Sequence, residues 1–342
     1  MRRLIIATQA VDPADPVLGA TVPKLRALAA RVDELVVLAD HAVGGVLPEN
    51  CRVHLFGSPS QAGRVRLFTA GLVRELRPRP LAFVAHMVPR YAILAAPLAL
   101  PARVPILLWF THWKRSRTLV LAERLSAAVL SVDRRSFPLE SGKVHAIGHG
   151  IDTDVFACAE RVAAAGPLRA VALGRTSPAK GYEVIARAAE LAGVELEIRG
   201  TSGTAEERQE RDRLVRLGAR VLDPVPHREV PALLATKDVL VDNMREGALD
   251  KVVYEAAAAC LPVLASNSGF DDVLPPELRF PRQDAEALAE RLRALATVDR
   301  NALGRELRAR VVERHSVERW AERLLAVAEA ARSRGATAVE QP

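Results

Sequence analysis

The sequence predicts an α/β protein with two doubly wound parallel sheets. Short segments that are apolar throughout alternate with helical segments along the chain, which is typical of parallel strands buried on both faces. Residues 238–266 run as strand, loop, helix and strand, the order of a βαβ unit. With 342 residues, 49% of them hydrophobic, the chain is long enough for two domains, each with its own core.

In the first half of the chain, apolar runs predict strands and amphipathic segments predict the helices between them. The strands are expected at 2–8, 33–40, 51–57, 81–87, 104–112, 128–133 and 143–148. The helices are expected at 20–32, 64–77, 90–100 and 116–127.

The second half repeats this alternation and then ends in helices. Strands are expected at 168–174, 194–200, 219–223, 238–241 and 263–265. Helices are expected from about residue 181 to 191 and at 204–218, 226–238, 251–260, 284–296, 301–315 and 316–334. We expect the tail, 335–342, to be disordered.

The net charge of +7 is concentrated in the first half. Residues 1–150 hold 20 Lys and Arg against 10 Asp and Glu, whereas the rest holds 28 against 31. This asymmetry indicates an anionic partner for the first half, either an acidic lipid surface or an anionic acceptor, with ordinary surface charge as the alternative. We expect no nucleic-acid partner, because aromatic residues make up 4% of the chain and no nucleic-acid-binding motif is present.

The three cysteines, Cys51, Cys158 and Cys260, are far apart and form no CxxC pair. The spacing therefore suggests neither a zinc site nor a disulfide framework, and a reducing cytoplasm is the expected compartment. No apolar run approaches the length of a membrane span, so we expect a cytoplasmic protein or one bound peripherally at the inner face of the membrane.

Ligands of doubly wound sheets bind beyond the carboxyl ends of the strands, which directs attention to the loops there. Gly19 lies in the loop that follows the first strand, and His86 and His112 end two later strands. A structural role is the alternative for either histidine.

A second candidate is the loop from Gly174 to Gly181, which joins a predicted strand to a predicted helix. It carries Arg175 and Lys180, with no acidic residue between them. Arg can hold a diphosphate with its planar fork, Lys adds a point charge, and the helix amino terminus adds N–H donors. The loop therefore predicts an anion site, with two solvated surface cations as the alternative. As a loop residue, Lys180 is expected to have little packing to lose.

A third candidate is Glu255, which lies on an otherwise apolar helix. A buried carboxylate needs a partner. The two hydroxyls of a ribose would suit it. The alternatives are that Glu255 caps the helix start or forms an ion pair with Lys251, four residues earlier. Asp250 and Lys251 lie at the same predicted crevice.

These stretches resemble the retaining glycosyltransferases of the GT-B fold, the family 4-like or group 1 enzymes. That family has Gly-Arg, four residues and Lys-Gly, which Gly174-Arg175 and Lys180-Gly181 match without a gap. It also has Glu-Gly and Glu-Ala pairs with seven residues between the glutamates. Here Glu246 and Glu255 have eight between them, so the loop holds one extra residue or the first glutamate is replaced by Gly247. The segment from His149 to Phe156 resembles the family's connection between domains.

The resemblance implies two Rossmann-like doubly wound domains that face a central cleft. Residues 1–150 would form the acceptor-side domain and 151–315 the nucleotide-sugar-binding domain, while the helix 316–334 would pack back on the first domain. Asp152 and Asp154 are interpreted as turn residues of the connection, and we expect no metal or other cofactor.

The activity implied is transfer of a sugar from a nucleoside-diphosphate sugar to a hydroxyl acceptor, anionic or lipid-linked among the candidates, with retention of configuration. A sugar-nucleotide epimerase and a non-catalytic, nucleotide-sugar-binding subunit are the alternatives. The resemblance implies catalytic roles for His86, Arg175 and Lys180 and acceptor-side roles for Gly19 and His112. It implies donor binding by Gly174, Arg175, Lys180, Glu246, Gly247, Ala248, Leu249, Asp250, Lys251 and Glu255.

Overall fold

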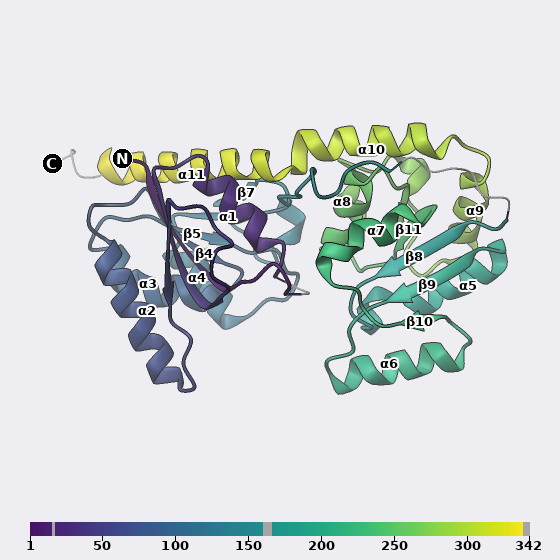
Figure 1. Cartoon of the computed structure of the whole chain (residues 1–342), viewed down its shortest axis with the longest axis horizontal. Helices are drawn as coiled ribbons and strands as arrows, with labels where there is room; N and C mark the ends of the chain where they lie inside the picture. Colours follow the sequence, from purple (N-terminus) through teal and green to yellow (C-terminus); the bar gives the residue numbers. More distant parts are fainter. Residues whose placement is uncertain (16–17, 160–165, 338–342) are drawn as a thin grey trace. The chain divides into compact units, whose positions relative to one another are not determined.

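The computed structural model describes residues 1–15, 18–159 and 166–337, and its contacts divide the chain into two compact units. Unit 1 consists of Met1–Gly150 and Val317–Pro342, and unit 2 consists of Ile151–Ser316. Along the sequence, unit 2 is therefore inserted before the last segment of unit 1. That last segment contains the helix α11 (Val317–Thr337), drawn in yellow in Figure 1.

Unit 1 is a parallel sheet in the order β3-β2-β1-β4-β5-β6-β7, covered by helices on both faces. On one side α1 packs against α11, and on the other α2, α3 and α4 pack in succession. The strands are β1 (Arg3–Val11), β2 (Glu34–Ala42), β3 (Cys51–Leu55), β4 (Phe83–His86), β5 (Ile106–Trp109), β6 (Ala128–Ser131) and β7 (Val144–Ala146). The helices are α1 (Thr21–Ala29), α2 (Gln61–Glu75), α3 (Pro89–Ala99) and α4 (Arg117–Leu125).

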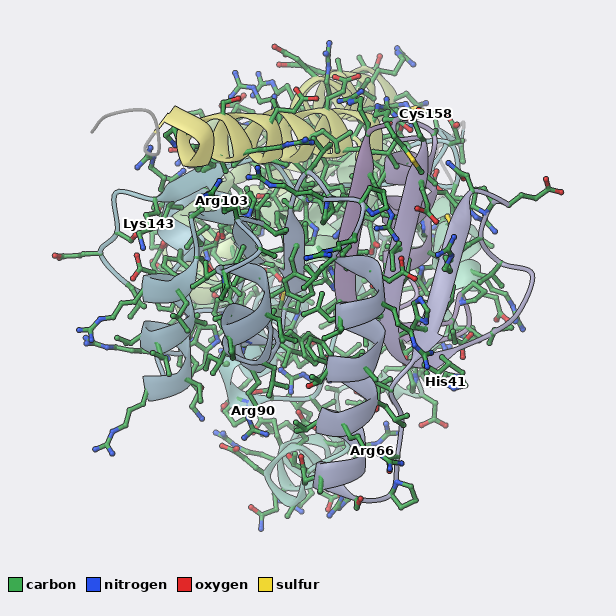
Figure 2. The ribbon with its side chains drawn as sticks, turned by 90° about the vertical axis from the view of Figure 1, so that its left-hand side faces the viewer. His41, Arg66, Arg90, Arg103, Lys143 and Cys158 are labelled. Carbon is green, nitrogen blue, oxygen red and sulfur yellow. A yellow bond between two sulfur atoms is a disulfide. The ribbon has the colours of Figure 1, made fainter. Side chains whose placement is uncertain are left out.

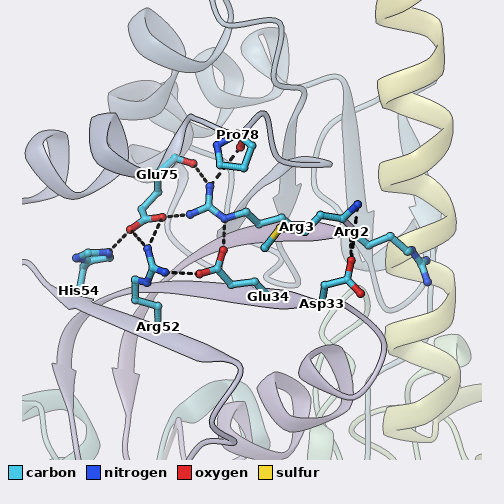
Figure 3. A network of polar contacts seen from close by, with 9 residues as sticks. Arg2, Arg3, Asp33, Glu34, Arg52, His54, Glu75 and Pro78 are labelled. Atoms are coloured by element: carbon cyan, nitrogen blue, oxygen red, sulfur yellow. Dashed lines mark hydrogen bonds and ion pairs between the residues drawn. The ribbon is translucent and has the colours of Figure 1, made fainter.

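One edge of the unit 1 sheet is held by a network of charged side chains (Figure 3). Arg3 on β1 is buried and contacts the carboxylates of Glu34 and Glu75. Glu75, at the end of α2, also accepts from Arg52 at 3.2 Å and from His54 at 2.7 Å, both on β3. Each buried charge thus has an opposite partner, which such burial requires. The network ties α2 to three neighbouring strands.

Unit 2 is a smaller parallel sheet in the order β10-β9-β8-β11-β12, again with helices on both faces. Its strands are β8 (Arg169–Leu173), β9 (Glu195–Arg199), β10 (Val221–Leu222), β11 (Val239–Asp242) and β12 (Val263–Ala265). Its helices are α5 (Tyr182–Ala192), α6 (Ala205–Arg216), α7 (Val230–Ala235), α8 (Lys251–Ala258), α9 (Ala285–Leu295) and α10 (Arg300–His315).

The predicted fold class is confirmed, and each of the predicted strands has a counterpart among the described residues. The differences are at element ends. His112 lies in a loop rather than in a strand, because β5 ends at Trp109. Residues 335–337 of the predicted tail are the last of α11, and 338–342 lie outside the described residues. No described helix has the length and apolar character that crossing a bilayer requires.

The prediction that no cysteines pair is wrong, because Cys158 and Cys260 form a disulfide. The two residues are 102 positions apart, so their spacing gave no sign of it. Their approach follows from Arg308 on α10, which donates to the carbonyl oxygens of Thr153 and Phe156 and also contacts that of Ala258. This arginine holds the segment before Cys158 against the end of α8, where Cys260 lies.

Candidate functional site

The strand order of unit 2 reverses between β8 and β11, and the crevice at such a reversal is the usual ligand site of a doubly wound sheet. The anion-site loop begins at Gly174, immediately after β8. The loop with Glu246 and Asp250 begins immediately after β11, which ends at Asp242. The structure therefore brings two of the predicted motifs to one edge of one sheet.

Lys180 lies at the centre of this edge. Its Nζ donates to the carbonyl oxygen of Leu173 at 3.0 Å, is 3.7 Å from Oδ2 of Asp242, and is in close contact with Oδ2 of Asp250. The side chain is buried. Lys180 thus links the end of β8, the end of β11 and the residue that begins α8.

The glycines at the two ends of the loop make room for neighbouring side chains. A Cβ on Gly174, which has φ +133°, would meet Nζ of Lys180 at 2.4 Å, and one on Gly181, with φ +58°, would meet Nδ2 of Asn243 at 2.4 Å. Both backbones also lie in the left-handed region, which favours glycine. The first glycine of the loop therefore leaves room for Lys180, and the last one leaves room for Asn243.

The expectation that Lys180 is a lightly packed loop residue is wrong. Its two acidic partners come from residues 62 and 70 positions further along the chain, so the absence of acidic residues within the loop did not reveal them. Burial by itself lowers the pKa of Lys180, but the charge of Asp250, with further contributions from Tyr182 and Asp242, raises it above its usual range. Lys180 is therefore charged at neutral pH.

Arg175, the other cation of the loop, has a different environment. Its side chain is 63% exposed and donates to Oε1 of Glu207 at 3.3 Å. Glu207 is fixed by the capping box of α6, in which it accepts from the backbone N–H of Thr204. Arg175 thus keeps most of its surface accessible, and a solvent-exposed pair of this kind contributes little to stability.

Glu255 is buried on α8 and is paired. Its Oε1 accepts from Nε2 of His227 at 2.8 Å and lies 3.0 Å from Nζ of Lys251. Burial alone would raise the pKa of Glu255, but the charge of Lys251 and the bonds from His227 and Lys251 lower it to about 2. The ion pair expected as the alternative is therefore present, and it holds Glu255 ionised.

Glu246 has local partners in its own unit. Its carboxylate accepts from the backbone N–H and from the hydroxyl of Ser268, each at 2.9 Å. Next to it, Asn267 donates to the carbonyl oxygens of Arg245 and Ala248. The loop after β12 thus fixes the loop after β11. Ala248 and Leu249 have buried side chains, which leaves their backbone, like that of Gly247, as the part that could meet a ligand.

The strand order of unit 1 reverses between β1 and β4, and His86 ends β4 at that point. Its Nδ1 is 3.2 Å from Oγ1 of Thr8 on β1. Burial, followed by the charge of Lys24, lowers the pKa of His86 to about 3. The imidazole is therefore neutral at physiological pH.

Lys24, on α1, is itself buried between two indole rings. Its Nζ is 5.2 Å from the ring centroid of Trp109 and 5.4 Å from that of Trp320, distances at which a cation is attracted to an aromatic face. Trp320 belongs to α11, so the last helix of the chain supplies one of the two rings that enclose Lys24 within unit 1.

The remaining predicted residues are in loops. Gly19 precedes α1, and its N–H donates to the carbonyl oxygen of Asp15 at 2.9 Å, although residues 16–17 of this loop lie outside the described residues. His112 accepts at Nδ1 from the backbone N–H of Lys114 and stacks on Trp113. Asp152 accepts from the N–H groups of Asp154 and Val155, which is turn chemistry.

Sequence reasoning missed several residues that organise these sites. Asp242 and His227 act on Lys180 and Glu255 from distant parts of the chain, and Lys24 acts on His86 in the same way. The one signal in the sequence was Asp242, an acidic residue at the end of an apolar strand. In the described ranges, no group of three or more His, Cys, Asp or Glu is arranged to hold a metal ion.

Comparisons with known proteins define the class. Residues 167–297 match the family model described as glycosyl transferases group 1. Sucrose-phosphate synthase from Thermosynechococcus elongatus aligns with a TM-score of 0.76 and 18% identity, over 95% of this chain and 97% of that one. HepE from Anabaena, in complex with UDP and glucose, aligns with a TM-score of 0.73 and 15% identity, over 95% and 98%. The catalytic domain of starch synthase IV from Arabidopsis thaliana, bound to ADP and acarbose, aligns with a TM-score of 0.73 and 14% identity, over 97% and 99%. No curated protein matches the chain in sequence.

The chain therefore has the GT-B fold of glycosyltransferases. Its residues 167–297, which contain the loops of Lys180 and Glu255, match the family model of group 1 glycosyl transferases. The resemblance found in the motifs is confirmed at this level.

A first prediction concerns Lys180 and stability. In Lys180→Met, the buried carboxylate of Asp242 and the partly exposed one of Asp250 lose their cation. Breaking a buried pair in this way costs about 3–5 kcal/mol. Adding Asp250→Asn should recover part of the loss. The free energy of unfolding is measured with urea at pH 8.

Arg187→Met is the matched control, because Arg187 pairs with Glu190 on the exposed face of α5. Surface pairs contribute about 0–1 kcal/mol, so this variant should unfold near the parent midpoint. Equal losses in Lys180→Met and Arg187→Met would contradict a buried, paired Lys180.

Proposed function

We propose that the protein transfers a sugar from a nucleoside-diphosphate sugar to a hydroxyl acceptor, with retention of the anomeric configuration. The observation that carries this proposal is a buried, charged Lys180 at the strand-order reversal of the group 1 domain. A fixed cation at this position, next to the amino terminus of α5, suits the diphosphate of a donor. The structural neighbours solved with UDP and with ADP support the same donor class.

In this proposal, the protein acts on the leaving group. When the bond between the sugar and the diphosphate breaks, positive charge develops on the sugar and negative charge on the diphosphate. Lys180 and Arg175 would stabilise the latter, and their positions are held before the reaction by Asp250 and Glu207. We propose that this stabilisation requires no metal ion.

Glu255 would hold the ribose. Its Oε1 is engaged by His227 and Lys251, which leaves Oε2 to accept from the ribose hydroxyls, and its lowered pKa keeps it ionised. Glu246 is in the same domain but is tied to Ser268. We therefore assign donor binding to Glu255 and to the backbone of Gly247–Leu249, and we assign Glu246 to holding the loop.

In unit 1, the neutral imidazole of His86 would contact the reacting sugar, as the resemblance implies. The ring is oriented by Thr8, and its low pKa means that it can donate or accept a hydrogen bond without carrying charge. Gly19 and His112 would belong to the acceptor side of this unit.

The alternatives predict different chemistry. A sugar-nucleotide epimerase would return an isomer of the sugar nucleotide, and a non-catalytic subunit would bind it unchanged. A transferase is expected to hydrolyse its donor slowly when no acceptor is present, because water then takes the acceptor's place. Release of nucleoside diphosphate from one sugar nucleotide would therefore favour transfer over both alternatives.

A second prediction uses Arg175, which can be removed with little effect on stability because it is exposed. A hydrogen bond to a charged group contributes about 1.5–3 kcal/mol, so Arg175→Ala should slow donor cleavage about ten- to a hundredfold. Arg175→Lys should recover part of the rate, because the charge remains but the planar fork is lost.

The rate is measured as nucleoside diphosphate released, with melting temperature as a check on folding. Arg208→Ala, in the same region but bonded to the backbone of Gly203, is the matched control and should keep the parent rate. Parent-like cleavage by a folded Arg175→Ala protein would contradict the assignment of Arg175 to the leaving group.

A third prediction separates the two glutamates. Glu255→Gln should weaken binding of the nucleoside diphosphate itself, about tenfold or more, because it loses a charged acceptor for the ribose. Glu246→Gln should leave that affinity near the parent value. Isothermal titration of both variants checks this, and the assignment is wrong if Glu246→Gln loses as much affinity as Glu255→Gln.

We also propose that unit 1 contacts an acidic membrane surface through α2, whose exposed face we call the α2 face. It combines Val65, Leu67 and Val73, which are 41%, 38% and 52% exposed, with Arg64, Arg66 and Arg74. Figure 2 shows Arg66 projecting from this helix. Apolar side chains between cations suit an anionic bilayer, where each cation contributes about 1 kcal/mol.

A fourth prediction follows from the α2 face. The protein should sediment with acidic vesicles at low salt and be released as salt screens the charges. Arg66→Glu should lower the bound fraction severalfold, whereas Arg216→Glu, at the exposed end of α6, should not. Equal recovery with neutral and with acidic vesicles at low salt would rule out this surface.

A further inference from the structure

The lysine of the proposed diphosphate site faces two carboxylates rather than one. Lys180 contacts Asp250 closely and lies 3.7 Å from Asp242. The side chain of Asp242 is 2% exposed and that of Lys180 is 9% exposed, while that of Asp250 is 24% exposed. An anion that enters this site must therefore approach a cation that acidic groups already neutralise.

The two carboxylates also act on each other. Burial, then the charge of Asp250 and a hydrogen bond with Asp250, raise the pKa of Asp242 to about 8, although Lys180 opposes this. The carboxyl group of Asp242, which is buried beside a second acidic group, therefore keeps a proton near neutrality. With Lys180 charged and one proton on the pair, the cluster is neutral overall.

The other groups around Asp242 do not change this balance. Tyr182, on α5, is buried, and burial raises its pKa, so it is neutral. The backbone N–H of Met244 donates to Oδ1 of Asp242 at 3.1 Å. Arg282, from the segment after β12, donates to the carbonyl oxygens of Asn243 and Ala179. Lys251, beside Asp250 on α8, is engaged with Glu255.

A diphosphate at Lys180 would compete with Asp250 for the same ammonium group. If Asp250 is displaced from Lys180, its carboxylate would lie near the phosphate charges and near Asp242. Neighbouring like charges raise the free energy of the ionised forms. Taking up a proton removes the repulsion. Asp242 and Asp250 are therefore positioning residues, which hold Lys180 in the free protein and adjust the charge of the site when it is filled.

We propose that Asp242 holds a proton beside Lys180 and Asp250, and that a nucleoside diphosphate binding at Lys180 draws a proton from solvent onto Asp242 whenever that carboxyl is ionised. The inference rests on the proposed function, because it takes Lys180 as the diphosphate contact. No covalent bond changes, and the proton comes from the buffer. Donor binding should then weaken as pH rises, because above the pKa of Asp242 the proton must be bound together with the nucleotide.

The experiment is isothermal titration of the full chain with UDP, GDP and ADP between pH 7 and pH 9, in two buffers with different heats of ionisation. The nucleotide phosphates are already ionised over this range, since their last pKa is about 6. At pH 8.5 we expect uptake of about half to one proton per nucleotide bound. The dissociation constant should rise, approaching about tenfold per pH unit at the alkaline end.

Asp242→Asn and Asp250→Asn should each remove most of the proton uptake and flatten the pH profile, which a merely structural role would not do. Asp223→Asn, whose side chain is 87% exposed, is the matched control and should keep both. Using both variants keeps the test decisive if one of them fails to fold.

The inference is wrong if the nucleotide binds with no proton uptake at any pH. It is also wrong if a folded Asp242→Asn or Asp250→Asn protein shows unchanged uptake. Either result would leave the proposed donor site in place. Failure of all three nucleotides to bind the parent protein at pH 7 would overturn the proposed function and the inference together.

Discussion

The ion pairs of Lys180 are the interaction on which the architecture of unit 2 depends. A charge that is almost fully buried must be compensated, and here the compensation comes from the residues that end β11 and begin α8. Because the same ammonium also bonds the carbonyl oxygen that ends β8, a single side chain fixes the two strands at the point where the strand order reverses. The glycine that follows β8 belongs to the same arrangement, because a Cβ on Gly174 would collide with the ammonium group of Lys180.

Unit 1 applies the same principle with different residues. At its own strand-order reversal, a hydroxyl on β1 and an imidazole on β4 meet, and a buried cation from α1 lies nearby between two indole rings. In unit 2 the buried cation is neutralised by carboxylates. In unit 1 the ring faces contribute to its stabilisation, and burial, together with its charge, keeps His86 unprotonated. Both units thus carry a buried cation at the carboxyl ends of their strands, and each cation sets the charge of the polar groups around it.

The sequence was sufficient to predict the fold because strands buried on both faces are apolar throughout and contrast with the helices between them. It was also sufficient to locate the loop of Lys180 and the helix of Glu255, since both motifs are local. It could not reveal partners that the fold brings together from far apart. Asp250 meets Lys180 from 70 residues away, His227 meets Glu255 from 28, and Cys158 meets Cys260 from 102. The misjudged packing of Lys180 and the missed disulfide share this cause.

The central claim is that the crevice of unit 2 binds a nucleoside diphosphate through Lys180, Arg175 and Glu255. The most direct measurement is the melting temperature of the parent protein and of Glu255→Gln in the presence of UDP-, GDP-, ADP- and dTDP-sugars. A ligand present at a hundred times its dissociation constant adds about 2.7 kcal/mol to the stability of the folded state. The account predicts that sugars of one nucleotide raise the melting temperature of the parent by several degrees and that of Glu255→Gln by clearly less. No shift with any of them, or the same shift in both proteins, would contradict it.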